Sequence, residues 1–406
     1  MTPKEVGPTA FRATNGRNEF WMRIMTIYGT RPEAIKVAPI IKAIEEADGF
    51  ESITVVTGQH REMLDQVNTL FKIVPDHDMN IMSAGQGLNS IVAKVIDGVD
   101  AILEQENPDA VIVQGDTSTV MGAAVAAFNR QIPVIHLEAG LRSGDINSPF
   151  PEEANRKLTS QIAALHLAPT STSRANLIRE TVDPESIVVT GNSVIDTLLH
   201  ATENFEVSFE DPRLEELQQK KADGTGGRIL LVTAHRRENL GEAMSDIGTA
   251  IADLAMSYPD LTIVFPSHKN PKVRAAIRPK VEELDNVILI EPLAYAEFTR
   301  ALSLADVVLT DSGGVQEEAP SLGKPVLVMR ENTERPEAVV AGTVKLIGTR
   351  HQRLVDEVSM LLDSEDAFAA MANAVNPYGD GQAARRTVQA IAWKFQGGER
   401  PEDFGV

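Results

Sequence analysis

Short apolar runs alternate with longer segments of helical periodicity along almost the whole chain. The run at 23–28 ends in Gly29, and Pro32 then stands where a helix begins, a position at which its missing N–H costs nothing. The cycle recurs in two series, which predict strands at 23–28, 53–57, 110–114 and 133–137, and then at 229–233, 262–265, 287–290, 307–310 and 326–328. Segments between them, such as 61–71 and 118–129, are expected to be helices. This alternation is typical of parallel sheets covered on both faces.

The two series predict an α/β protein with two doubly wound domains. Ligands of such domains bind in a cleft at the carboxyl ends of the strands. We place the first domain at 22–190 and the second at 191–380. Residues 1–21 lack the apolar run of a signal peptide and are expected to be a disordered N-terminal extension, with Met22 as an alternative start of translation.

Composition narrows the classes of ligand. The 406 residues include 38 basic and 58 acidic side chains, a formal charge of −20, and no cysteine. The negative charge argues against general binding of nucleic acid or membranes, although a few local cations can still hold a small phosphorylated ligand. The lack of cysteine excludes disulfides, thiolate metal sites and a cysteine nucleophile, and it is compatible with the cytoplasmic location we expect. No apolar stretch approaches the ~18 residues of a membrane span.

Familiar cofactor and nucleophile motifs are incomplete or missing. The segment 379–384 loosely resembles a dinucleotide-binding loop, but no strand is predicted before it and Ala384 replaces its last glycine. The segment 321–325 resembles a phosphate loop, but Glu318 and Pro325 stand where a glycine and a Ser or Thr are required. The eight histidines show no metal-binding spacing, and there is no GxSxG serine elbow. We therefore expect neither NAD nor a metal as cofactor.

Two glycine-containing loops at strand ends are candidate anion sites. Residues 29–33 (GTRPE) follow the first strand, with Lys36 one helical turn later, and residues 311–314 (DSGG) follow a strand of the second series. Free N–H groups at a helix start suit a phosphate, and acids such as Glu317 and Glu318 suit ribose hydroxyls. The alternative is an ordinary strand–helix turn whose charges complement the helix dipole.

Further charged groups follow other strands. Asp116 and Glu138 each come at a strand end, and two prolines bracket a stiff loop that presents Glu152. Carboxylates that share a cleft push their pKa values apart, which gives an acid and a base near neutral pH, whereas capping of loops is the alternative. His235 and the two arginines after it suit a polyanionic leaving group, and a structural histidine is the alternative.

In their order along the chain, these blocks resemble the non-hydrolysing UDP-N-acetylglucosamine 2-epimerases of bacteria. The resemblance extends from Met22 to about Trp393. It is carried by GTRPEAIK (29–36), QHREMLDQV (59–67), QGDTSTV (114–120), HLEAGLRSGD (136–145), SPFPEEANR (148–156), TGNSVID (190–196), HRREN (235–239), LTDSGGVQEEAPSLGKPVLVMRENTERPEAV (309–339) and NPYGDGQAARR (376–386).

The resemblance implies a GT-B-like pair of Rossmann-like domains, with a C-terminal helix in 381–406 that packs back on the first domain. It also implies a homodimeric isomerase that interconverts UDP-GlcNAc and UDP-ManNAc without NAD or metal, for cell-envelope polysaccharide synthesis. UDP leaves C1 as the C2 proton is removed, which gives 2-acetamidoglucal, and UDP re-adds after a proton has returned on the other face. Carboxylates serve well as the two proton-handling groups.

The resemblance also assigns roles to residues. The catalytic positions are Asp116, Glu138, Glu152 and His235. The acid that serves each face of C2 stays open, and His235 is expected to stabilise the departing diphosphate together with Arg31. The positions that contact UDP or its sugar are Arg31, Lys36, Phe298, Ser312, Gly313, Gly314, Glu318 and Arg335, with Phe298 against uracil.

The segment 59–66 resembles that of members activated by UDP-GlcNAc. It implies an allosteric site at Gln59, Arg61, Glu62 and Arg236. Two departures concern these sites, because Gly85 stands where some activated members carry a basic residue and Leu293 where some members carry Gln. Three alternatives stay open: a hydrolysing epimerase that releases ManNAc, a GT-B glycosyltransferase, and a non-catalytic UDP-sugar sensor.

Overall fold

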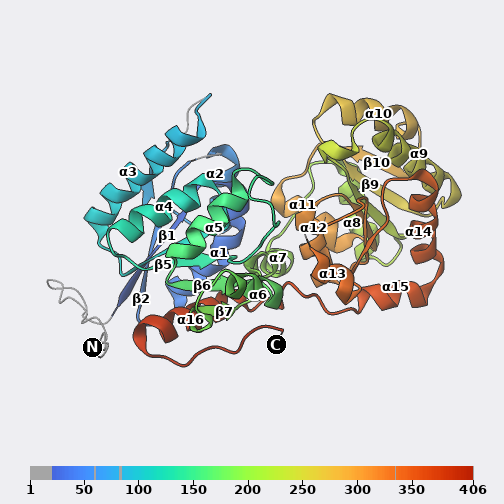
Figure 1. Cartoon of the computed structure of the whole chain (residues 1–406). Helices are drawn as coiled ribbons and strands as arrows, with labels where there is room; N and C mark the ends of the chain where they lie inside the picture. Colours follow the sequence, from blue (N-terminus) through green and yellow to red (C-terminus); the bar gives the residue numbers. More distant parts are fainter. Residues whose placement is uncertain (1–20, 59–60, 82–84, 334, 406) are drawn as a thin grey trace, which may run out of the picture.

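The computed structural model contains two parallel sheets, each in its own half of the molecule (Figure 1). It describes residues 21–58, 61–81, 85–333 and 335–405, with the backbone alone at 61–63 and 237. The predicted extension over 1–21 lies outside this part of the chain except for Trp21. The predicted fold class, α/β with two Rossmann-like domains, is confirmed.

The first sheet has the strand order β3-β2-β1-β4-β5-β6-β7, and every neighbouring pair is parallel. Its strands are β1 (Met22–Tyr28), β2 (Phe50–Val56), β3 (His77–Asp78), β4 (Ala110–Gln114), β5 (Val134–Leu137), β6 (Leu165–Ala168) and β7 (Ile187–Val189). Chain order reverses between β1 and β4, so the ligand crevice of a doubly wound domain is expected there.

The second sheet repeats this arrangement with the order β10-β9-β8-β11-β12-β13, again all parallel. Its strands are β8 (Ile229–Thr233), β9 (Thr262–Pro266), β10 (Val287–Ile290), β11 (Val307–Thr310), β12 (Val326–Val328) and β13 (Val344–Leu346). The reversal now falls between β8 and β11. The strands that the sequence did not predict are β3, β6, β7 and β13, each of two to four residues.

Helices cover both faces of each sheet. The helices up to residue 204 are α1 (Arg31–Glu46), α2 (Arg61–Leu70), α3 (Leu88–Glu106), α4 (Ser118–Asn129), α5 (Glu152–Ile162), α6 (Ser171–Arg179) and α7 (Ser193–Asn204). Those that follow are α8 (Pro212–Ala222), α9 (Glu242–Ser257), α10 (Pro271–Val281), α11 (Tyr295–Leu304), α12 (Gly313–Glu318), α13 (Pro336–Ala341), α14 (His351–Asp363), α15 (Glu365–Ala372) and α16 (Ala383–Gln396).

The core on each side of a sheet follows from the alternation of side chains along a strand. In β4, Ile112 packs in a cluster with α1, α7 and α16, whereas its neighbour Val111 packs in another cluster with α3 and α4. The second sheet likewise separates a cluster with α9, α10 and α14 from one with α8, α11 and α12. Because both faces are buried, central strands such as β4, β8 and β11 are mostly apolar, which is why they are visible in the sequence.

The chain crosses between the two halves twice, and the two crossings touch. The first crossing follows β7 and the second precedes α16, and the Asn192 N–H donates to the carbonyl of Tyr378 at 2.6 Å. Gly191 has a φ of +85°, and a Cβ there would lie 3.4 Å from the backbone of Gly379. Helix α16 then packs against α1, α7 and β6, so the chain ends beside its first domain (Figure 1).

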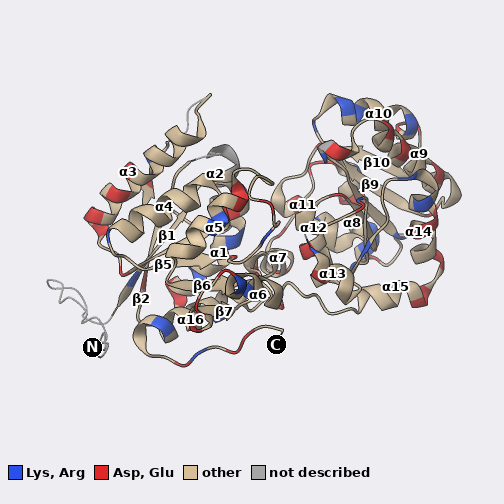
Figure 2. Ribbon diagram, in the orientation of Figure 1, with Lys and Arg blue, Asp and Glu red and all other residues tan. Residues whose placement is uncertain are grey.

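Charged side chains are spread over the helices of both halves, with acidic and basic residues interspersed (Figure 2). Within the described part of the chain, no helix is both long enough and apolar enough to cross a membrane.

Candidate active site between the two domains

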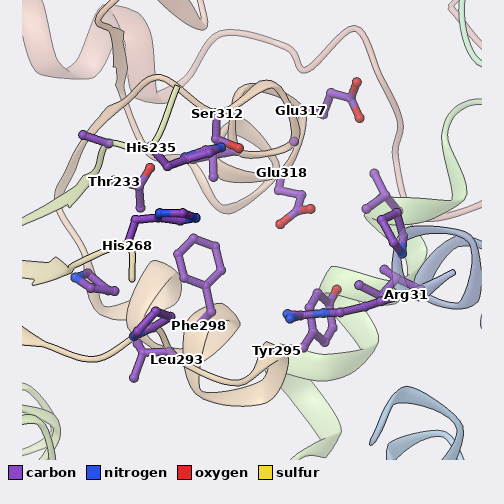
Figure 3. Close-up of a pocket in the computed structure, with 18 of the residues that line it drawn as sticks. Arg31, Thr233, His235, His268, Leu293, Tyr295, Phe298, Ser312, Glu317 and Glu318 are labelled. Atoms are coloured by element: carbon purple, nitrogen blue, oxygen red, sulfur yellow. The ribbon is translucent and has the colours of Figure 1, made fainter. Parts of the chain in front are cut away.

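A cavity of about 750 Å³ lies between the two domains, at the carboxyl ends of their strands. The part of the chain before the second sheet contributes five residues to the cavity wall, which are Arg31, Pro32, Ile35, Lys36 and Val194. Those from the second domain are Thr233, Ala234, His235, Pro266, His268, Pro292, Leu293, Tyr295, Phe298, Ser312, Gly314, Val315, Glu317, Glu318 and Arg335. Figure 3 shows Arg31, Phe298 and Glu318 pointing toward its centre.

The first-domain wall is built on the turn between β1 and α1. A Cβ at Gly29 would lie 2.1 Å from the Thr57 hydroxyl, so no side chain fits there. Thr30 caps α1 in a capping box with Glu33, whose carboxylate accepts the N–H groups of Gly29 and Thr30 at 2.7 Å. The same carboxylate accepts the hydroxyl of Thr117 at 2.5 Å. Glu33 therefore fixes the turn that carries Arg31 to the loop that carries Asp116.

The second-domain wall is built on the turn between β11 and α12. Ser312 and Gly314 line the cavity at the start of α12, whereas Gly313 is buried directly behind them. A Cβ at Gly313 would lie 2.5 Å from the guanidinium of Arg335. The glycine therefore allows Arg335 to pack against this turn and to reach the cavity.

The cavity carries both signs of charge. Arg31, Lys36 and Arg335 line it together with Glu317 and Glu318, and Arg335 donates to Glu317 at 2.6 Å. Burial, together with the nearby carboxylate of Glu317, raises the pKa of Glu318 to about 8. A carboxyl group that is neutral near pH 7 can donate a hydrogen bond as well as accept one.

Glu138 directly follows β5 and takes the left-handed conformation, with a φ of +61°. Its carboxylate pairs with the ammonium of Lys36 and accepts the amides of Gln114 at 2.5 Å and Asn192 at 3.2 Å. Burial alone would raise the pKa of Glu138, but Lys36 outweighs burial and lowers it. Burial would lower the pKa of Lys36, and Glu138 and Glu317 outweigh it in the same way. A strained backbone and a satisfied buried charge at one position are typical of functional sites.

Asp116 and Glu152 lie on the loop after β4 and at the start of α5. Arg156 of α5 bridges Asp116 at 2.6 Å and Glu153 at 2.8 Å, and so ties the two elements together. The described residues that line the cavity do not include Asp116, Glu138 or Glu152. Glu138 is joined to that wall through Lys36. The sequence placed all three acids in the cleft, whereas in the structure only Glu138 is joined to the cavity wall and Asp116 is held by Arg156.

His235 lies on the loop after β8 and enters the cavity wall from the second domain. Its Nδ1 lies 3.1 Å from the carboxylate of Asp311, and its ring stacks on His268 at a centroid distance of 6.0 Å. Asp311 is fully buried at the end of β11, the strand beside β8. The two strand ends at the reversal of the second sheet therefore carry the histidine and its carboxylate partner.

The sequence did not identify Tyr295 and His268 as cavity residues. Tyr295 begins α11, is 7% exposed, and its hydroxyl has no hydrogen-bond partner within the described structure. The apolar spacing of α11 hides it, because a tyrosine on a buried helix face is usually core. His268 follows β9. Its place just after a predicted strand is the sequence feature that could have identified it as a cavity residue.

The predicted allosteric residues are only partly described. Gln59 lies outside the described residues, and Arg61 and Glu62 are described by their backbone alone, at the start of α2. Arg236 follows His235, and its N–H donates to Asp311 at 2.9 Å. Leu293 lines the cavity, and Gly85 lies in a turn before α3 with open space around it.

Comparisons with known proteins agree with this arrangement. The family model described as UDP-N-acetylglucosamine 2-epimerase matches residues 42–392. The UDP-N-acetylglucosamine 2-epimerase of Salmonella typhimurium is 50% identical over 370 residues, which cover 91% of this chain and 98% of that protein.

Two solved structures are similar over almost their whole length. UDP-GlcNAc 2-epimerase from Neisseria meningitidis, bound to UDP-GlcNAc, is 45% identical with a TM-score of 0.80, over 91% of this chain and 99% of that one. MnaA from S. aureus, in a structure with UDP, is 45% identical with a TM-score of 0.81, over 95% of this chain and 100% of that one. The predicted resemblance is thereby confirmed, and the chain belongs to the UDP-N-acetylglucosamine 2-epimerase family, a family of isomerases.

Proposed function

We propose that this protein interconverts UDP-GlcNAc and UDP-ManNAc by eliminating UDP and adding it back. One observation carries the proposal. Arg31, His235 and Ser312 converge on one cavity from the reversal points of two sheets, and Lys36 in the wall of that cavity is paired with a buried carboxylate. This combination supplies cations for a diphosphate beside groups that can move a proton. The substrate bound in the relative from Neisseria meningitidis supports the same ligand.

In the proposed reaction, a base removes the C2 proton while the C1–O bond to UDP breaks. The electron pair of the C2–H bond forms the C1=C2 double bond of 2-acetamidoglucal, and UDP leaves with the electrons of the C1–O bond. A proton then returns to C2 on the opposite face, and UDP adds to C1. Arg31 and His235 stabilise the charge on the diphosphate, and Asp116, Glu138 and Glu152 handle the protons.

The proposed binding mode follows the walls of the cavity. Phe298 packs on the uracil ring and Glu318 bonds the ribose hydroxyls, while Ser312, Gly314 and Arg335 face the phosphates. Gly313 acts through its lack of a side chain, since it leaves room for Arg335. Lys36 lies between this nucleotide site and Glu138, where it can contact the reacting sugar.

The test is to incubate the purified protein with UDP-GlcNAc in D₂O and to follow the reaction by NMR. We expect UDP-ManNAc to appear with deuterium at C2 of both epimers. Free ManNAc would indicate the hydrolysing alternative, and absence of exchange at C2 would indicate a transferase or a sensor. Activity that survives dialysis against EDTA, with no added nucleotide cofactor, is expected because no step of the proposal needs either.

A further inference from the structure

We propose that Asp311 is a positioning residue that holds His235 with its proton on Nδ1, so that Nε2 is left for the ligand. The inference rests on the proposed function in one respect only, which is the role of His235 in stabilising the diphosphate. The arrangement of Asp311 and His235 is itself a property of the protein without ligand, and it can be tested as such.

The topology of the second sheet brings the two residues together. Strands β8 and β11 are parallel neighbours in which Thr233 pairs with Thr310, and the hydroxyls of these threonines lie 2.6 Å apart. Asp311 follows Thr310 directly and His235 follows Thr233 after one intervening residue, so the fixed register of the two strands places the carboxylate beside the ring. Asp311 has no exposed surface, whereas the His235 side chain is 40% exposed and lines the cavity.

The two oxygens of Asp311 have different partners. Oδ2 accepts the N–H of His235 at 2.9 Å, the N–H of Arg236 at 2.9 Å and the amide of Asn239 at 3.0 Å. Oδ1 lies 3.1 Å from Nδ1 of His235 and 3.1 Å from the backbone nitrogen of the same residue. Oδ2 therefore closes the loop after β8, and Oδ1 is the atom that faces the ring.

A loop-closing role alone does not require an acid at this position. An asparagine could place its single carbonyl oxygen where Oδ2 lies and satisfy the same three donors. Burial would raise the pKa of Asp311, but the bonds from His235 and from the Arg236 N–H outweigh it and lower the pKa, so the carboxylate stays charged. A charged oxygen beside Nδ1 accepts a hydrogen bond from the proton on that nitrogen, and it stabilises a positive ring when phosphate charge develops on the other side.

The neighbouring histidine is held in the opposite way and serves as an internal reference. The N–H of Asn270 donates to Nδ1 of His268 at 3.1 Å, so the proton of that ring is on Nε2. The rings of His235 and His268 stack with an interplanar angle of 26°. Two stacked histidines in one cavity are thus assigned different tautomers by different partners.

The experiment compares ring ¹⁵N chemical shifts in the ligand-free protein at alkaline pH, where the histidines are neutral. In the wild type we expect His235 with its proton on Nδ1 and His268 with its proton on Nε2, assigned with His235→Gln and His268→Gln. In Asp311→Asn the amide nitrogen replaces Oδ1 and donates to Nδ1, so we expect His235 to change to the Nε2 proton. Asn239→Ala removes a donor from Oδ2 and from the carbonyl of Met329 but none from Oδ1, and it should leave the His235 tautomer unchanged.

Kinetics supply the second readout. Asp311→Asn should lower kcat about 10²-fold with a smaller change in KM, because the charge that His235 stabilises develops as UDP leaves. A wild-type His235 with its proton on Nε2 overturns the proposal, and this result needs no variant to fold. Loss of activity in a folded Asp311→Asn protein with an unchanged tautomer also overturns it. A tautomer change in a protein that epimerises nothing would instead contradict the proposed function and leave the assignment of Asp311 standing.

Discussion

The two domains face their shared cavity in different ways. On the first-domain side, two carboxylates are held in ion pairs, Glu138 with Lys36 and Asp116 with Arg156. On the second-domain side, the wall includes the rings of Phe298 and Tyr295, and the Tyr295 hydroxyl has no hydrogen-bond partner among the described residues. Paired charges keep their geometry without a ligand, whereas an unsatisfied buried hydroxyl is a cost that a ligand can remove. The difference is consistent with the proposed function, in which the first domain transfers the protons and the second binds the nucleotide.

The largest expected effect comes from the first domain. Glu138→Gln should lower kcat by about 10²–10⁴-fold, because a general acid or base contributes that much, while the Kd for UDP changes little. Steady-state kinetics and calorimetric titration of UDP measure the two quantities. The matched control is Glu180→Gln, which breaks an ion pair with Arg142 away from the cavity and should keep turnover. If Glu138→Gln lost UDP affinity together with turnover, proton transfer and nucleotide binding would not be divided between the two domains.

The second effect belongs to the nucleotide side. Phe298→Ala should weaken UDP binding by about 10- to 100-fold, since stacking of a base on an aromatic ring is worth ~1–3 kcal/mol. Phe298→Tyr should retain most of the affinity, and kcat at saturating substrate should change less than Kd. Calorimetric titration with UDP and with uridine checks this, and an unchanged Kd for the alanine variant contradicts the placement of the uracil ring.

The third prediction concerns pH and stability. The pKa of Glu318 is about 8 in the folded protein against an ordinary value of 4.5, so the folded state keeps a proton that the unfolded state has released between these values. The wild type therefore loses stability as the pH rises through this window, whereas Glu318→Gln cannot ionise. The ligand-free variant should match the wild type near pH 5 and exceed it by about 4 kcal/mol near pH 9.

Thermal unfolding of both proteins at the two pH values tests this expectation. Glu216→Gln, on the outer helix α8, is the control and should show no such divergence. If Glu318→Gln is the less stable protein at alkaline pH, the carboxylate has a stabilising partner and the assignment of the cavity charges is wrong.

The smallest effect is expected at Tyr295. Tyr295→Phe removes a hydroxyl that has no partner in the free protein, so ligand-free stability should stay the same or rise. If the ligand uses this hydroxyl, UDP or UDP-GlcNAc affinity should fall by about 5-fold, which is ~1 kcal/mol. Tyr258→Phe, which removes a bond to Asp363 on the surface, should show the reverse pattern, with lower stability and unchanged affinity.

The sequence predicted the strands that are buried on both faces, because such strands are mostly apolar. β4, β8, β10, β11 and β12 have the predicted bounds. It missed β3, β6, β7 and β13, since strands of two to four residues carry too little pattern. β6, for instance, contains His166, a buried histidine whose pKa is lowered to about 3 by burial. A buried polar residue in so short a run conceals the strand.

The sequence also identified the loops of the site, because the reversal point of each sheet is marked by glycine and charge. The sequence could not show which side chains from distant parts of the chain contact each other. Lys36 and Glu138 are 102 residues apart, and the contact between them depends on the order of β1, β4 and β5. For the same reason Asp311 was grouped with its glycine loop, while its contact with His235 follows from the register of β8 and β11.

The double crossing between the domains has a mechanical consequence. Two chain segments that touch, as at Asn192 and Tyr378, form a pair of tethers close together at one side of the cavity. Two adjacent interdomain segments allow the domains to rotate about the line that joins the segments. They resist rotation of one domain about the axis that joins the two domains. Opening and closing would then follow a single path, which returns His235 and the Lys36–Glu138 pair to the same relative position in every turnover. The proposed reaction, whose intermediate has to be held until UDP adds back, would benefit from a hinge of this kind.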